Sequence, residues 1–134
     1  MKDEEVIKII LHEAFYIHKI IGPGLLENVY KTCLAFRLRK KGLYVEMEKP
    51  VPVIFEEVKM DCGYRADLVV EKIIIVDTKT IDAIGDLQIS QLLTYLRFLH
   101  LRKGLIINFN TVLLKNGIKR VINGFERASE YQQE

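Results

Sequence analysis

The sequence predicts a single α/β domain that begins with two helices and continues with strands, a third helix and further strands. The chain has 134 residues, of which 49% are apolar, enough for one hydrophobic core. Apolar residues recur at helical spacing up to Lys41, and beyond Gly42 they alternate with polar residues as in a strand. Because no linker or repeat interrupts this order, we expect residues 1–134 to form one domain, with a polar tail from about 127 to 134.

The first two elements are predicted to be helices with one buried face each. Residues 4–21 form the first, with Asp3 as its expected cap, and Gly22-Pro23-Gly24 should end it because proline cannot continue a helix. The second spans about 25–41 and is followed by Gly42, in the usual position past a helix end. The expected inner residues are Val6, Ile9, Ile10, Ala14, Ile17 and Ile21 in the first helix, and Leu26, Val29, Tyr30, Cys33, Leu34 and Leu38 in the second.

Strands should occupy much of the middle of the chain. Residues 43–47 alternate apolar and polar, as expected of a strand with one solvated face. Pro50 and Pro52 favour an edge position for a strand at 51–55, because proline donates no ladder hydrogen bond. Residues 56–63 should then form a turn or hairpin.

The second half of the chain is predicted to hold the centre of the sheet. Two strands are expected at 64–70 and 73–79, and the uninterrupted apolar run 73–76 predicts a strand covered on both faces. The third helix should span 86–101, with Leu87, Leu92, Tyr95, Leu96 and Leu99 facing the core. Short strands at 105–109 and 118–122 complete the expected elements.

Charge and composition exclude several classes of protein. A net charge of +2 does not by itself identify a nucleic-acid-binding protein, although basic residues cluster at 37–41, 97–103 and 115–120, where they could hold phosphates or simply complement helix ends. The N-terminal residues lack the pattern of a secretory signal, and no apolar run reaches the roughly 20 residues of a membrane span. We therefore expect a cytoplasmic protein whose Cys33 and Cys62 are free thiols.

An aspartate and a lysine inside the most apolar part of the chain require an explanation. Asp77 and Lys79 are two residues apart on one expected strand, so they project to the same face. Asp67 on the preceding strand shares that face if Val70 pairs with Ile74, which leaves a three-residue turn. A two-residue turn would direct the two aspartates to opposite faces, unless a bulge intervened.

These three side chains have two interpretations. When two carboxylates lie side by side, their repulsion raises the pKa of one of them unless a cation lies between them. Mg²⁺ is a suitable cation, because it takes oxygen ligands and keeps coordination positions for water and phosphate. Lys79 would then orient the attacking water or neutralise developing charge. The alternative is a structural ion pair between Asp77 and Lys79, which a short D-x-K triplet taken alone would favour.

Several ordered motifs resemble one family of nucleases. Asp67, the apolar strand and Asp77-Thr78-Lys79 resemble the PD-(D/E)XK signature, and residues 24–30 (GLLENVY) match the motif of the GxxExxY proteins within that superfamily. Further similar blocks are YRADL at 64–68, QLLTYL at 91–96 and IINF at 106–109. The similarity extends from about Ile17 to Asn123 and implies a restriction-endonuclease-like core: a mixed central sheet flanked by helices, with two N-terminal helices.

The resemblance also implies roles for residues outside the central triplet. Glu27 is carried over as an acidic residue that supports the metal or its waters, alongside the metal ligands Asp67 and Asp77. Gln91 is carried over as a polar helical residue facing the site. Expected at the rim are Tyr30, whose ring should pack in the core, Gln88 and Tyr95. The chain departs from the family pattern in two places, with Asp77 where most relatives have glutamate and Gln88 where histidine is frequent.

Three functional hypotheses follow from these residues. The first is a nuclease that uses Mg²⁺ or Mn²⁺ to hydrolyse phosphodiester bonds of DNA, or alternatively RNA, through Asp67, Asp77 and Lys79, with Glu27 and Gln91 assisting. Because so small a domain offers limited surface for gripping a duplex, we expect a homodimer. The second is a nuclease-fold protein that binds nucleic acid or a protein partner without cutting. The third is an interaction module with a structural ion cluster.

Overall fold

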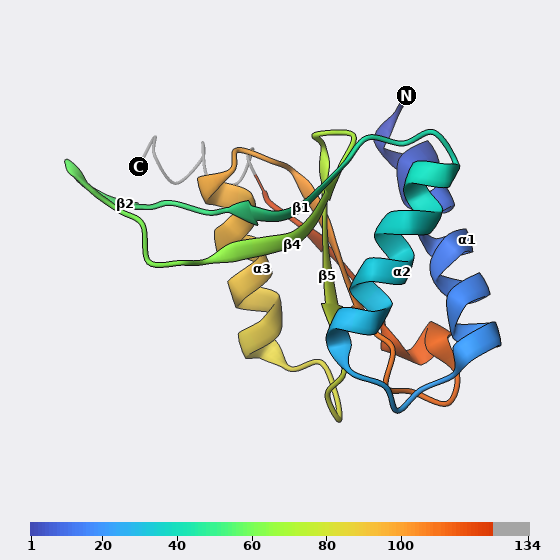
Figure 1. Cartoon of the computed structure of the whole chain (residues 1–134). Helices are drawn as coiled ribbons and strands as arrows, with labels where there is room; N and C mark the ends of the chain where they lie inside the picture. Colours follow the sequence, from blue (N-terminus) through green and yellow to red (C-terminus); the bar gives the residue numbers. More distant parts are fainter. Residues whose placement is uncertain (125–134) are drawn as a thin grey trace.

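A computed structural model describes residues 1–124 of the chain, so the predicted polar tail at 127–134 lies outside the described residues. The helices are α1 (Asp3–Ile21), α2 (Glu27–Lys40), α3 (Asp86–Phe98) and the short 3-10 helix η1 (Leu114–Gly117). The strands are β1 (Val45–Pro50), β2 (Val53–Phe55), β3 (Val58–Met60), β4 (Arg65–Val70), β5 (Ile74–Lys79), β6 (Lys103–Asn108) and β7 (Ile118–Ile122). The two N-terminal helices and the alternation of strands with a third helix are confirmed (Figure 1).

Five strands form one mixed sheet in the order β1-β4-β5-β6-β7. Only β5 and β6 run parallel, joined by the crossover through α3, while the other neighbours are antiparallel. β5 is the third of the five strands, and its residues from Ile74 to Thr78 are buried. The apolar run at 73–76 therefore forms the centre of the sheet, as its lack of alternation predicts.

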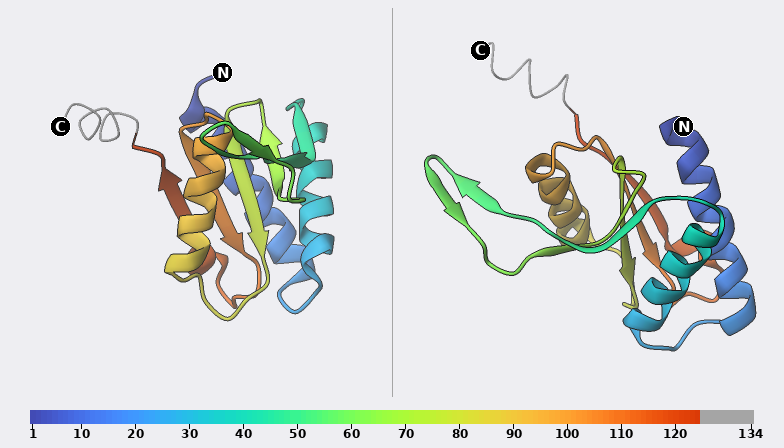
Figure 2. Two further views of the ribbon diagram at one scale, coloured as in Figure 1. Left: turned by 90° about the vertical axis from the view of Figure 1, so that its left-hand side faces the viewer. Right: turned by 45° about the horizontal axis from the view of Figure 1, so that its top comes forward.

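The helices cover the sheet from both sides, with α1 and α2 on one face and α3 on the other (Figures 1 and 2). Residues of β4 and β5 alternate between two cores. Leu68 and Val76 pack toward α1 and α2, whereas Val69 and Ile75 pack toward Leu92 and Leu96 of α3. Asp77 has the same parity as Ile75, so its side chain starts on the α3 face of the sheet, whereas strict alternation in β4 is broken around Asp67, since Ala66 and Val69 both pack toward α3.

The helix boundaries differ from the sequence-based expectation at a few positions. Asp3 is the first helical residue and not a cap, since the cap position is Lys2 and makes no side-chain bond. Leu26 and Leu87, both expected inside, are each 78% exposed because they lie at helix starts, where the periodic face has not yet reached the sheet. Val29 is also exposed on the outer side of α2. Gly42 follows α2 with φ +86°, a conformation that glycine adopts without strain.

A buried carboxylate joins the two N-terminal helices. Glu13 of α1 is fully buried, and its Oε1 accepts a hydrogen bond of 2.8 Å from Nε of Arg37 in α2. Its other oxygen lies 2.9 Å from Nδ1 of His12. Burial raises the pKa of Glu13, but the bonds to His12 and Arg37 outweigh burial, so the net pKa lies below its ordinary value. The ion pair therefore holds α1 against α2 as a charged group.

The segment predicted as an edge strand of the main sheet instead leaves it. β2 and β3 pair only with each other, so the prediction that 51–55 extends the sheet is wrong, and the predicted hairpin at 56–63 includes its return strand. The chain departs where Pro50 and Pro52 withhold two ladder donors, while the Val51 N–H between them still bonds to the Tyr64 carbonyl at 2.9 Å. The hairpin projects from the body of the protein (Figure 2).

None of the helices within residues 1–124 combines the length and apolarity needed to cross a bilayer. Cys33 is half-buried and Cys62 is exposed, and both are free thiols.

Candidate functional site

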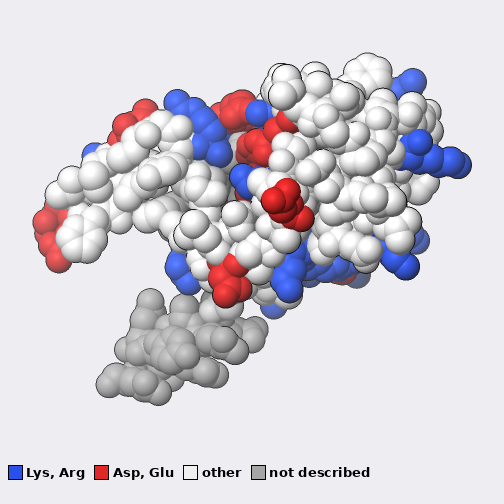
Figure 3. All heavy atoms as spheres, turned by 90° about the horizontal axis from the view of Figure 1, so that it is seen from below, with Lys and Arg blue, Asp and Glu red and all other residues white. Residues whose placement is uncertain are grey.

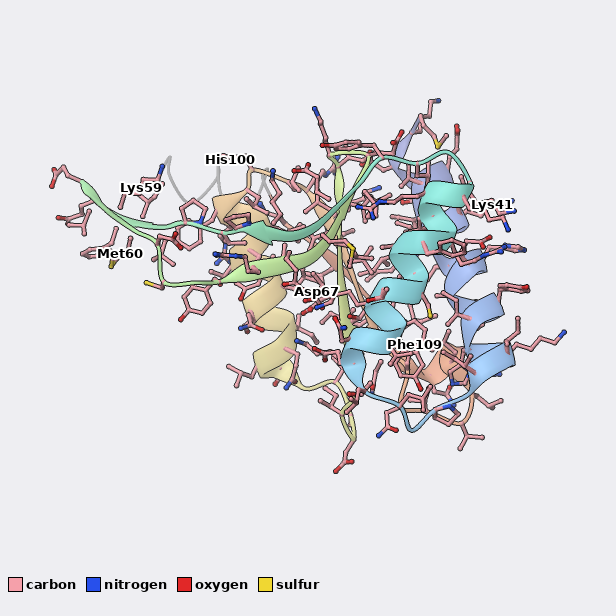
Figure 4. The ribbon with its side chains drawn as sticks, viewed as in Figure 1. Lys41, Lys59, Met60, Asp67, His100 and Phe109 are labelled. Carbon is pink, nitrogen blue, oxygen red and sulfur yellow. The ribbon has the colours of Figure 1, made fainter. Side chains whose placement is uncertain are left out.

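The candidate site lies in a fork of the sheet, where β4 and β5 separate. The two strands pair from Val70↔Ile74 to Leu68↔Val76, and the ladder stops there. The turn between them has three residues, which is the register that brings Asp67 and Asp77 to one face. The next pair in this register would be Asp67 and Asp77, so two carboxylates stand where the strands begin to diverge. Asp67 lies between the sheet and the first turns of α2 (Figure 4).

Asp67 is fixed by its neighbour across the fork. Its Oδ2 accepts hydrogen bonds from the backbone N–H of Thr78 at 2.9 Å and from the Thr78 hydroxyl at 3.1 Å. Both donors come from the residue between Asp77 and Lys79. The sequence of β5 therefore orients Asp67 and at the same time supplies the two charged side chains beside it.

Asp77 is 6% exposed, and the Asp67 carboxyl lies beside it. Burial raises the pKa of Asp77, the hydrogen bond to Asp67 and its charge raise it further, and Lys79 opposes them, giving a pKa of about 7 compared with the ordinary 3.8. A carboxyl pair held this close favours a cation between its oxygens.

Lys79 completes the centre of the site. Its Nζ lies 3.4 Å from Oδ1 of Asp77, at the end of β5, and the side chain is largely buried. Burial lowers the pKa of Lys79, but the charges of Asp77, Glu27 and Asp67 outweigh burial and leave it above its ordinary value. In the metal-free protein Lys79 is therefore a cation and not a general base at neutral pH.

Glu27 enters the site from the other side of the fork, as the first residue of α2. Burial raises the pKa of Glu27, the charge of Asp67 adds to this effect, and Lys79 opposes it. These mutual effects place the Glu27 carboxyl near both Asp67 and Lys79. A carboxylate in a first turn is also favoured by the positive end of the helix dipole.

Tyr30 holds the loop that leads into Glu27, the first residue of α2. Its ring is fully buried and stacks on Phe109 with centroids 4.5 Å apart. Its hydroxyl donates to the Gly22 carbonyl at 2.6 Å and accepts a bond of 3.1 Å from the Leu25 N–H. The core packing expected of Tyr30 is thus present, but its hydroxyl bonds to the loop between α1 and α2 and not to the carboxylates, because that loop lies directly over it.

The expected residues of α3 fall into two groups. Tyr95 lies near the carboxylates, since burial raises its pKa and the charge of Asp77 raises it further. Gln91, one turn earlier on the same face, is exposed and lines a cavity together with Tyr95. Gln88 instead caps its own helix, because its Oε1 accepts a bond of 2.7 Å from the Gly85 N–H. Its side chain is therefore engaged at the start of α3.

Two further charged residues that the sequence analysis did not single out lie beside the site. Lys31, one turn after Glu27, forms an ion pair with Glu48 of β1. Burial lowers the pKa of Lys31, but the bond to Glu48 and the charge of Asp67 outweigh it and raise the pKa overall. Glu48 lies opposite Asp67 in the β1–β4 register and has a φ of 54°, rare for a non-glycine residue, so the ladder skips this pair. The i,i+4 spacing of Glu27 and Lys31 was the available sequence signal.

The donor chemistry of the fork fits a hard divalent cation. Within residues 1–124 no three Asp, Glu, His or Cys side chains are grouped as a ready-made metal site, so Glu27 is near the pair without forming a three-carboxylate group with it. Mg²⁺ commonly binds through one or two carboxylates and completes its shell with water and substrate phosphate. The buried Asp67–Asp77 pair meets that requirement. Acidic and basic side chains lie close together around the hollow where the hairpin joins the body (Figure 3).

A comparison with protein families gives one result for this chain. The family model described as the PD-(D/E)XK nuclease superfamily matches residues 4–121. Neither the curated proteins nor the solved structures include a match. The match is at the level of the superfamily, and assignment to the GxxExxY proteins stays a prediction from the motif at 24–30.

Proposed function

The chain belongs to the PD-(D/E)XK nuclease superfamily, whose members generally use divalent metal ions, and we propose that it is a metal-dependent nuclease acting through Asp67, Asp77 and Lys79. The observation that carries the proposal is the pair of carboxylates in the sheet fork with an ammonium 3.4 Å from one of them. A purely structural ion pair would need only one carboxylate, and the second raises the pKa of the first.

The proposed metal ligands are the carboxylates of Asp67 and Asp77, with Glu27 holding water of the ion's shell. Mg²⁺ or Mn²⁺ bound there would polarise the phosphoryl oxygen and acidify a bound water. Asp67 is oriented by its two bonds from Thr78, which fix its Oδ2 and leave Oδ1 without a bond from Thr78.

Lys79 acts on the phosphate as a cation. Its raised pKa keeps the ammonium protonated at neutral pH, so it can neutralise the charge that develops on the non-bridging phosphate oxygens. In the reaction, a water oxygen bonds to phosphorus as the phosphodiester P–O bond breaks. The products are a phosphate monoester and a hydroxyl, which receives a proton. Glu27, whose pKa is raised by burial, is the proposed acceptor of the proton that the water loses.

The substrate is nucleic acid, with DNA proposed ahead of RNA, and a homodimer is proposed because one small domain offers limited contact area to a duplex.

The test is a cleavage assay on end-labelled DNA and RNA with Mg²⁺, with Mn²⁺ or with EDTA. Wild-type protein is compared with Lys79→Ala and with Lys72→Ala, a matched control because Lys72 is exposed in the turn at the opposite end of β5. We expect metal-dependent cleavage that Lys79→Ala reduces by at least about 100-fold and Lys72→Ala leaves unchanged. Cleavage that survives Lys79→Ala would identify a contaminant. Metal-dependent nucleic-acid binding without cleavage would replace the proposal by a binding function.

A further inference from the structure

A cavity lies beside the carboxylate fork, between the root of the β2–β3 hairpin and α3. Its volume is about 250 Å³. Clefts that bind drug-sized ligands measure about 300–1,000 Å³, so this one is suited to a single small ring system. Its walls are mainly apolar and aromatic, and the lining residues are Val51, Val53, Tyr64, Gln91, Thr94, Tyr95 and Phe98.

The aromatic walls offer stacking surfaces. The rings of Tyr64 and Tyr95 lie 6.1 Å apart between centroids and are tilted by 56°. Tyr64 is 45% exposed, so part of its ring is accessible to a ligand. Aromatic side chains placed along a nucleic-acid path bind bases by stacking, and every base has a π-face that fits.

The polar groups of the cavity select among planar ligands. Gln91 is exposed and lines the cavity, and its amide offers two donors and an acceptor. The Thr94 hydroxyl is already engaged, since it donates to the Ser90 carbonyl at 3.0 Å. Gln91 is therefore the group available to pair with the edge of a heterocyclic base.

The cavity adjoins the segment that carries Asp67, since Tyr64 lines the cavity and precedes β4, three residues before Asp67. Tyr95 lines the cavity and also lies close enough to Asp77 and Lys79 for their charges to affect its hydroxyl. A base seated on Tyr64 would thus hold its own backbone phosphate toward Lys79.

We propose that this cavity binds an unpaired nucleobase next to the phosphate to be cleaved, so that the preferred substrate is single-stranded or carries a base displaced from its stack. A paired base within a duplex has its ring faces covered by neighbours and could enter only after extrusion. The inference rests on the proposed nuclease function for the placement of the phosphate, whereas the base-binding site itself stands on the cavity.

The test measures binding without cleavage, by fluorescence anisotropy in EDTA. Three labelled DNA probes of the same length are compared: a single strand, the same strand in a duplex, and a strand of abasic residues. We expect the single strand to bind at least about tenfold more tightly than either of the others. Equal binding of the abasic strand or the duplex, or no binding of the single strand, overturns the inference.

Substitutions of residues that line the cavity test whether the base binds there. Tyr64→Ala should weaken single-strand binding by about tenfold, with Tyr64→Phe restoring it. Tyr44→Ala is the matched control, because Tyr44 is 52% exposed and precedes β1 as Tyr64 precedes β4. A single strand containing 2-aminopurine should lose fluorescence on binding to wild type but not to Tyr64→Ala. Gln91→Ala gives a second reading, since it should change the ratio of affinities among homopolymers. Equal behaviour of Tyr64→Ala and Tyr44→Ala refutes the proposal.

The two proposals fail separately. If no substrate is cleaved but Tyr64-dependent single-strand binding is found, the nuclease proposal fails and the base site remains. If cleavage depends on Lys79 but neither binding nor cleavage depends on Tyr64 or on unpaired bases, only the base site fails.

Discussion

Replacing Asp77 by asparagine should make the metal-free protein more stable at alkaline pH while removing the proposed activity. The Asp77 carboxyl is buried next to Asp67, and both burial and that neighbour favour its protonated form. Asparagine has nearly the same shape and carries no charge. It should therefore occupy the site without the cost of ionisation, which the wild type bears as a condition of binding a cation.

The size of the effect follows from the pKa. Asp77 has an ordinary pKa of 3.8 and a folded-state pKa of about 7. Because the folded pKa is the higher one, the folded state holds the proton more tightly, and stability decreases as pH rises between the two values. Each pH unit in that interval is worth about 1.4 kcal/mol, so full ionisation costs about 4 kcal/mol. Between pH 5 and pH 8.5 the loss is about 2–3 kcal/mol.

The assay is urea unfolding in EDTA at pH 5 and pH 8.5. The wild type should lose about 2–3 kcal/mol more between these values than Asp77→Asn does. Asp82→Asn is the matched control, since Asp82 is an exposed aspartate in the loop after the same strand, and it should keep the wild-type pH dependence. A pH dependence of Asp77→Asn equal to that of wild type would refute the account of a strained carboxyl pair.

The other predictions concern the metal and two structural bonds. At pH 8, Mg²⁺ should raise the thermal midpoint of the wild type and not of Asp77→Asn, by an amount that grows with the logarithm of its concentration; equal shifts would show that the ion binds elsewhere. Tyr30→Phe keeps the stacked ring but removes both loop bonds, so it should destabilise the protein by about 1–3 kcal/mol in urea unfolding and reduce kcat. An unchanged midpoint would mean that water replaces the hydroxyl. Glu13→Gln should cost about 1–3 kcal/mol at pH 7 because Arg37 loses its charged partner, and unaltered unfolding would contradict a charged Glu13.

Much of the fold follows from local patterns in the sequence. The first two helices and the central strand are predicted because the positions of apolar residues in 4–41 and 73–76 reflect which side chains are buried. The register of β4 with β5 follows from the sequence only on the hypothesis that Asp67 and Asp77 share a face, which one of the two turn lengths allows. Each of these predictions uses residues within one segment or within two neighbouring strands.

The features that sequence patterns did not predict depend on the chain in three dimensions. The segment at 51–55 has the composition of a strand, but composition does not say that the strand pairs only with its own hairpin. Leu87 fits the helical period and is exposed because α3 starts beyond the edge of its core. The ion pair of Lys31 with Glu48 joins a helix to a strand 17 residues later, and neither position is unusual in its own segment.

The motif at residues 24–30 acquires a physical explanation once Tyr30 is placed. Gly24 has φ +99°, which a turn between two packed helices requires and which other residues adopt with strain. Tyr30 bonds to the loop on both sides of that turn and so stabilises the start of α2, where Glu27 is the first helical residue. The three residues named by the motif therefore act together. Gly24 allows the turn, Tyr30 stabilises it through two hydrogen bonds, and Glu27 follows it at the start of α2. Substituting the tyrosine should therefore affect the chemistry through Glu27, although its own hydroxyl does not touch the carboxylates.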